Sequence, residues 1–74
     1  MKFKDIIRIR ESLDFDRHEF AKVLGLSGYR SLMNVELGRR RPNKLAIRLL
    51  CYLDSLPKSK ALAFIEEFTK WDEK

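Results

Sequence analysis

Residues 16–38 read DRHEFAKVLGLSGYRSLMNVELG, and this stretch decides the predicted fold. Asp16 and Glu19 have the spacing of a capping box, which is typical of a helix N-terminus. Gly25 and Gly38 each follow an apolar run, in the position that glycine commonly takes just past a helix end. The stretch therefore predicts two short helices joined by a tight turn. Their expected ranges are about 17–24 and 29–37.

The spacing of small and apolar residues predicts that these two helices form a helix-turn-helix. Ala21 is small enough to let the second helix cross the first closely, and Gly25 follows it in the turn. Leu32 and Val35 stand three residues apart, as the two core anchors of the second helix do. The second helix is therefore the expected reader of duplex DNA in the major groove.

Helical periodicity continues on both sides of this unit, over about residues 2–13, 44–55 and 58–71. No stretch has the alternation of a strand, so the predicted fold is all-α with five helices. Residues 1–57 form the expected DNA-binding core, and residues 58–74 add a C-terminal helix to the same domain. The expected inner faces are Phe3, Ile6, Ile7, Arg10 and Leu13 in the first helix, and Leu45, Leu49, Tyr52 and Leu53 in the fourth, with Cys51 as a small core residue beside them.

The formal net charge of +5 is concentrated in the middle of the chain. Residues 28–48 contain six Lys or Arg against one acid, whereas residues 1–27 contain six against five and residues 49–74 four against five. A basic segment between nearly neutral ends indicates a polyanionic partner such as nucleic acid. The alternative is a basic face that is merely solvated.

Other classes of function lack the residues that they need. Cys51 is the single cysteine and His18 the single histidine, so no internal disulfide, metal site or cofactor is expected. No nucleophile–base pair, carboxylate dyad or phosphate loop indicates an enzyme. No apolar run approaches the roughly 20 residues of a membrane span, and no secretory signal is present, so we expect a cytoplasmic protein without a membrane partner.

Taken together, these segments resemble the phage-repressor helix-turn-helix family, the Xre-type and Cro-like regulators. The segment DRHEFAKVLGLS is similar to that family's second helix and turn, NVELGRRRP to the end of its third helix, and IRLLCYLDSLP to its fourth. The resemblance covers about residues 5–57 and implies a λ-repressor-like fold. It also implies a transcriptional regulator, expected to be an autorepressor of a phage or mobile element. Among compact relatives, the anti-CRISPR-associated regulators are similar in plan.

The chain departs from the family pattern in three places. The interval from Gly25 to Leu32 is one residue longer, and Gly28 is suited to absorb the insertion, so the recognition helix is expected to start within a residue of position 29. Arg17 stands where the family often has a glutamine that contacts phosphate. Residues 58–74 extend beyond the shared core.

Helical geometry and the resemblance assign the residues that would contact DNA. With the two anchors inward, the outward and base-facing set is Tyr29, Arg30, Met33 and Asn34. Arg30 suits the O6 and N7 atoms of guanine, Asn34 suits the N6 and N7 atoms of adenine, and Met33 or Tyr29 suits a thymine methyl group. A phosphate contact is the alternative for Arg30, and packing against the fourth helix is the alternative for Tyr29. The expected phosphate contacts are Arg17, Ser27, Arg39, Arg40, Arg41, Asn43 and Lys44.

One buried ion pair is expected between the first helix and the recognition helix. Arg10 lies on the apolar face of the first helix, where an unpaired charge would be costly. Glu36 is the one acid of the basic segment, and the resemblance implies a pair at these two positions. The alternative is that both side chains are solvated.

The last helix has an apolar arc that is wider than one core requires, which indicates an interface. We expect a symmetric homodimer on an inverted-repeat operator with half-sites about 34 Å apart. The expected dimer interface is Leu62, Ile65, Phe68 and Trp71. The alternative is that this helix only caps the core of the monomer.

Two other functions are compatible with this fold. One is the antitoxin subunit of a toxin–antitoxin operon, and the other is a protein-interaction module without DNA binding. No surface for a toxin is evident in the sequence.

Overall fold

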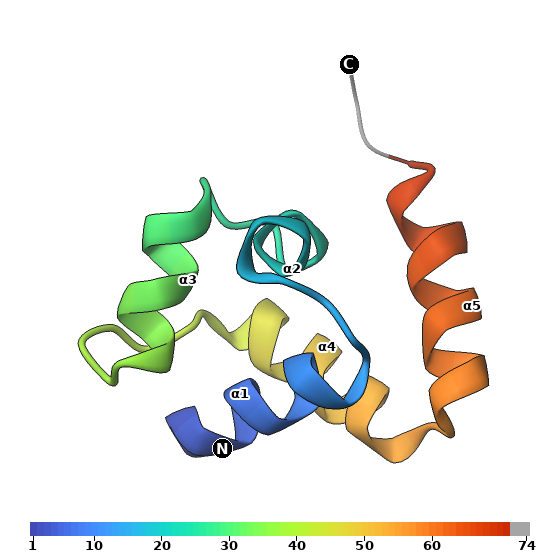
Figure 1. Cartoon of the computed structure of the whole chain (residues 1–74), viewed down its shortest axis with the longest axis horizontal. Coiled ribbons are helices and arrows are strands. Elements are labelled where there is room, and N and C mark those ends of the chain that lie inside the picture. Colours follow the sequence, from blue (N-terminus) through green and yellow to red (C-terminus); the bar gives the residue numbers. More distant parts are fainter. Residues whose placement is uncertain (72–74) are drawn as a thin grey trace.

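The computed structural model describes residues 1–71 and contains five α-helices there, with no strand (Figure 1). The last three residues of the predicted C-terminal segment lie outside the described residues. The first four helices gather around one centre, and α5 runs along the side of the molecule opposite α3. The helices are α1 (Phe3–Ser12), α2 (Arg17–Val23), α3 (Tyr29–Glu36), α4 (Lys44–Ser55) and α5 (Lys58–Thr69).

Short polar residues start two of the helices at the positions that the sequence predicts. The Asp16 side chain accepts a hydrogen bond of 2.8 Å from the backbone N–H of Glu19, which caps α2. The Asn43 side chain accepts one of the same length from the backbone N–H of Ala46, which caps α4. Each cap satisfies a backbone donor that the helix itself leaves free, a contribution of about 1 kcal/mol.

A single core draws side chains from all five helices. Its largest fully buried members are Phe20, Ile6, Ile9, Leu32, Leu50 and Leu53. Ala61 and Ile65 of α5 are only 0% and 4% exposed and belong to the same cluster. Burying one such large side chain contributes about 1.5–3 kcal/mol, so α5 is part of this domain.

Helix α4 turns a different face inward from the predicted one. Ala46 and Leu50 are buried together with the correctly predicted Leu53, whereas Leu45 is 73% and Tyr52 48% exposed. The expectation for Leu45 and Tyr52 was therefore wrong, and so was that for Cys51, which is exposed as well. The apolar arc of α4 is broad and lies opposite Lys44, Arg48 and Ser55; the buried residues lie near its middle, whereas Leu45 and Tyr52 lie at its edge.

The first helix differs from the prediction at its start. Its buried face consists of Ile6, Ile9, Arg10 and Leu13, whereas Phe3 is 43% exposed and Ile7 is half-buried. The Phe3 ring instead covers Gly38, at the end of α3. A Cβ atom added to Gly38 would lie 3.3 Å from that ring, and Gly38 also has a φ of +76°, which favours glycine.

None of the helices within residues 1–71 combines the length and the apolar character that crossing a bilayer requires.

Candidate nucleic-acid interface

The turn between α2 and α3 is closed by backbone hydrogen bonds around Gly25. The N–H of Leu26 donates to the carbonyl of Ala21 at 2.9 Å, and the N–H of Gly25 donates to that of Lys22 at 3.1 Å. These two bonds are those of a Schellman motif, which requires the left-handed conformation that Gly25 adopts at a φ of +70°. The motif fixes the direction in which the chain leaves α2 and therefore sets the start of α3.

Gly28 separates the turn from α3. Gly28 is the N-cap of α3 in an extended conformation, and the helix begins at Tyr29, as expected. Next to it, the hydroxyl oxygens of Ser27 and Ser31 are 2.6 Å apart and share a hydrogen bond. Gly28 is therefore extended and not left-handed, unlike Gly25.

The inner face of α3 agrees with the prediction. Leu32 and Val35 are 0% and 4% exposed and anchor the helix against α2 and α1. Of the four residues predicted to face bases, Arg30 is exposed, and the others are half-buried at the surface. The half-buried residues are Tyr29, Met33 and Asn34.

Tyr29 packs against α2 rather than against α4. Its ring stacks on the imidazole of His18, with centroids 4.8 Å apart and an angle of 25° between the planes. Core packing against α4, the alternative for Tyr29, is therefore not what the structure contains. The contribution of His18 was missed in the sequence, because nothing there connects position 18 with the first residue of the next helix.

The residues predicted to contact phosphate lie in and beside the loop between α3 and α4. Arg39, Arg40, Arg41 and Lys44 are exposed. The loop is held by the backbone carbonyl of Asn34, which accepts hydrogen bonds from the N–H groups of Arg39 at 2.8 Å and Arg40 at 3.3 Å. Ser27 is exposed at the other end of α3, and Asn43 keeps its amide nitrogen free while its oxygen caps α4.

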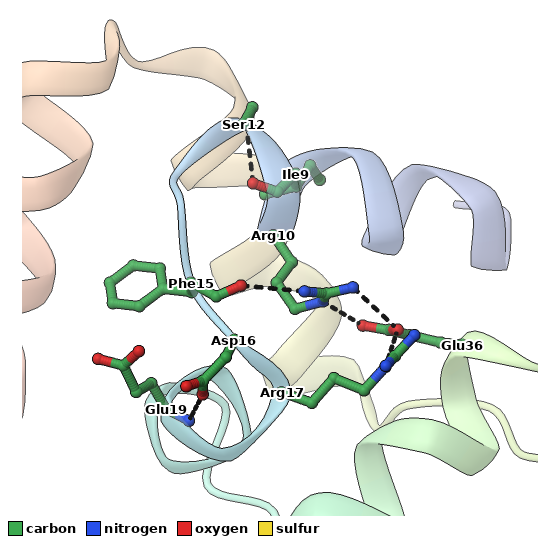
Figure 2. Close-up of polar contacts among 8 residues, drawn as sticks. All are labelled: Ile9, Arg10, Ser12, Phe15, Asp16, Arg17, Glu19 and Glu36. Atoms are coloured by element: carbon green, nitrogen blue, oxygen red, sulfur yellow. Dashed lines mark hydrogen bonds and ion pairs between the residues drawn. The ribbon is translucent and has the colours of Figure 1, made fainter.

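A buried cluster of three charged side chains ties α1, α2 and α3 together (Figure 2). The Arg10 Nε atom donates to Glu36 Oε2 at 2.7 Å, and the two side chains are only 10% and 2% exposed. The predicted pair is thus present. Arg10 also donates from Nη1 to the carbonyl of Phe15 at 2.9 Å, which fixes the loop between α1 and α2. Arg10 therefore links the last residue of α3 to the loop between α1 and α2.

Arg17 is the third member of this cluster, which the sequence did not indicate. Its Nε atom donates to Glu36 Oε1 at 2.8 Å, while 40% of its side chain remains exposed. This hydrogen bond and the charge of Glu36 raise the pKa of Arg17 above its usual value. Arg17 was predicted to contact phosphate; in the structure Nε is engaged, and the exposed part of the guanidinium remains available.

Beyond this cluster, α5 and its neighbours present a second exposed surface. Ile65 is a core residue and not the interface residue that was expected, and Leu62 is half-buried against the core. Phe68 and Trp71, however, are 46% and 82% exposed. Phe68 borders a groove of about 380 Å³ between α2, α4 and α5, whose apolar walls include Leu45. We refer to this hollow as the α5 groove.

Within residues 1–71 no three His, Cys, Asp or Glu side chains gather where a metal ion could be held, and nothing indicates an enzymatic activity. Searches of protein-family models, curated proteins and solved structures found no match to this chain.

Proposed function

We propose that this chain has a λ-repressor-like helix-turn-helix fold and is a sequence-specific regulator of transcription, a dimeric autorepressor that places α3 in the major groove. One observation carries the proposal: an α3 with buried anchors and an outward polar face lies directly beside an exposed run of three arginines, Arg39 to Arg41. A helix of this kind supplies contacts to base edges, and a basic loop beside it supplies contacts to phosphate.

In this proposal the two kinds of contact have different tasks. Arg30 forms bidentate bonds to guanine and Asn34 to adenine, each discriminating against a wrong base by about 1–3 kcal/mol. The arginines of the loop contact phosphate oxygens, which sets the register of the protein on the duplex without reading sequence. The Arg10–Glu36–Arg17 cluster supports both, because it fixes the end of α3 from which the loop leaves.

We further propose that two copies associate through the α5 groove. The exposed Trp71 of one copy enters the groove of the other, which removes the largest exposed aromatic side chain from water. The groove is bordered by Lys22 and Arg48, which have no ion-pair partner among the described residues, and Glu66 is exposed on α5, where Glu67 is paired with Lys70. In the proposed dimer, Glu66 of each copy lies near the basic border of the other copy's groove, so that the contact is two-fold symmetric.

Selection of bound sequences from a pool of random duplexes tests the function directly. We expect an enriched inverted repeat, with guanine and adenine at fixed positions of each half-site. The control is the double variant Arg30→Ala/Asn34→Ala, whose changes lie on the outer face of α3; it should bind duplexes without enriching any sequence. A wild-type chain that binds no duplex at about 50 mM salt, where electrostatic binding is strong, would refute the proposal.

In the alternative functions, the α5 groove binds a different protein. In an antitoxin, or in a pure interaction module, this groove would receive a different protein instead of a second copy. Such a chain would remain monomeric alone at micromolar concentration. Light scattering of the purified chain distinguishes the two, because the repressor proposal requires a dimer under those conditions.

A further inference from the structure

Two lysines from the start of the chain line the same cleft as two arginines of the loop between α3 and α4. The cleft has a volume of about 430 Å³, and Lys2, Lys4, Arg40 and Arg41 are among the residues around it. Figure 1 shows the first turn of α1 on the same side of the molecule as this loop. This cluster is not evident in the sequence, because residues 1–27 are nearly neutral as a whole.

The positive charge of this cleft is not compensated by neighbouring acids. No Asp or Glu lines the cleft, and the four cations have no ion-pair partner within residues 1–71. Asp5, the nearest acid in the sequence, accepts a bond of 3.1 Å from the backbone N–H of Lys2 and lies 3.6 Å from Arg8. Four like charges at one cleft repel one another, and an anion bound among them would remove that repulsion.

Packing holds the two halves of the cleft together. Phe3, between the two lysines, covers Gly38 at the base of the loop, and buried Ile6 and Val35 form part of the cleft floor. The lysines therefore belong to a folded edge of the domain and not to a loose end of the chain. All four cations remain exposed, so an extended polyanion can reach them.

We propose that Lys2 and Lys4 join Arg40 and Arg41 in a second phosphate-binding edge, which extends the DNA footprint beyond the helix-turn-helix. The ligand is the sugar–phosphate backbone of duplex DNA, contacted irrespective of base sequence. The inference rests on the proposed function, and it assigns the start of α1 to DNA binding. It requires no contribution from the recognition face of α3.

The salt dependence of DNA binding tests this edge. Fluorescence anisotropy measures the affinity of the full chain for a labelled duplex over a range of NaCl concentrations. For Lys2→Gln/Lys4→Gln we expect the slope of log K against log salt to become shallower by roughly 1.8, about 0.9 for each lost phosphate contact. If the variant and the wild type bind equally at about 1 M salt, this change of slope makes the variant bind roughly 30-fold more weakly than the wild type at about 0.15 M salt.

Two further variants make the result decisive. Lys58→Gln/Lys60→Gln removes the same charge at the start of α5, away from the cleft, and should leave the slope unchanged; it also breaks the exposed ion pair between Lys58 and Asp14. Lys2→Arg/Lys4→Arg keeps the charge and should keep the wild-type slope. The unfolding free energies of all variants should agree within about 1 kcal/mol, since these side chains are exposed and the one ion pair lost, Lys58–Asp14, is exposed as well. Equal slopes for Lys2→Gln/Lys4→Gln and Lys58→Gln/Lys60→Gln would overturn this inference alone, whereas a wild-type chain that binds no duplex would overturn the proposed function with it.

Discussion

Neutralising the Glu36 carboxylate tests the buried charge cluster most directly. Glu36→Gln preserves the shape of the side chain but removes the charge that two guanidinium groups share. Arg17 is 40% exposed and can turn toward water, whereas Arg10, whose side chain is only 10% exposed, cannot do so without disturbing α1. The cost of the substitution therefore arises mainly from Arg10.

An unpaired buried charge destabilises a protein by roughly 3–5 kcal/mol. A core in a domain of this size supplies about 3–5 kcal/mol in total, so Glu36→Gln should be close to unfolded at room temperature. Urea unfolding followed by circular dichroism measures the difference. With a slope of about 1 kcal/mol per molar urea, the midpoint should fall by about 3 M.

Two comparisons isolate the cause. Arg17→Gln removes the more exposed partner and should cost about 1 kcal/mol or less. Arg10→Met/Glu36→Leu replaces the buried pair with apolar side chains and should recover most of the lost stability, because no buried charge is left without a partner. If Glu36→Gln unfolds within about 1 kcal/mol of the wild type, the cluster does not hold α3 as described.

Three further results are expected. Trp71→Ala should give a monomer by light scattering at micromolar concentration with unchanged helix content, because this side chain is 82% exposed; a persistent dimer would contradict the α5 contact. Gly25→Ala meets no atom within 4 Å but must adopt a φ of +70°, so it should cost about 1 kcal/mol and lower the melting temperature by about 4–8 °C; an unchanged melting curve would be inconsistent with the strained turn. The hydrogen bonds from Arg8 lower the pKa of Asp54, so this pair stabilises the fold above the unfolded-state pKa, and that stabilisation is lost as the pH falls through the lower folded-state value. Arg8→Gln should raise the Asp54 pKa in an NMR titration, and an unshifted titration would show that the pair does not form in solution.

Local signals explain which parts of the fold could be predicted from the sequence. The Asp16 cap and the turn at Gly25 depend only on residues a few positions away, so the local sequence is sufficient to predict both. The partner of Arg10 was also predictable, because a charge on an apolar face needs an opposite charge and the basic segment contains one acid, Glu36.

The parts that could not be predicted depend on how helices cross. Helix α4 has a broad apolar arc that contains both Leu45 and Leu50, and its packing against the other helices buries Leu50 and leaves Leu45 exposed at the edge of the arc. The proximity of Lys2 to Arg41, and of Arg17 to Glu36, joins segments that are distant in the sequence. The buried anchors of α3 were predictable, whereas the contact of Arg17 behind the helix and the basic edge beside it were not.

The position of Trp71 has a practical consequence for spectroscopy. It is the single tryptophan of the chain, it lies beyond the end of α5, and its indole is largely in water. Its emission should therefore change little when the core unfolds, but it should shift to shorter wavelength when a second copy covers the ring. Intrinsic fluorescence then reports association while circular dichroism reports folding, and the two equilibria can be followed separately in one sample.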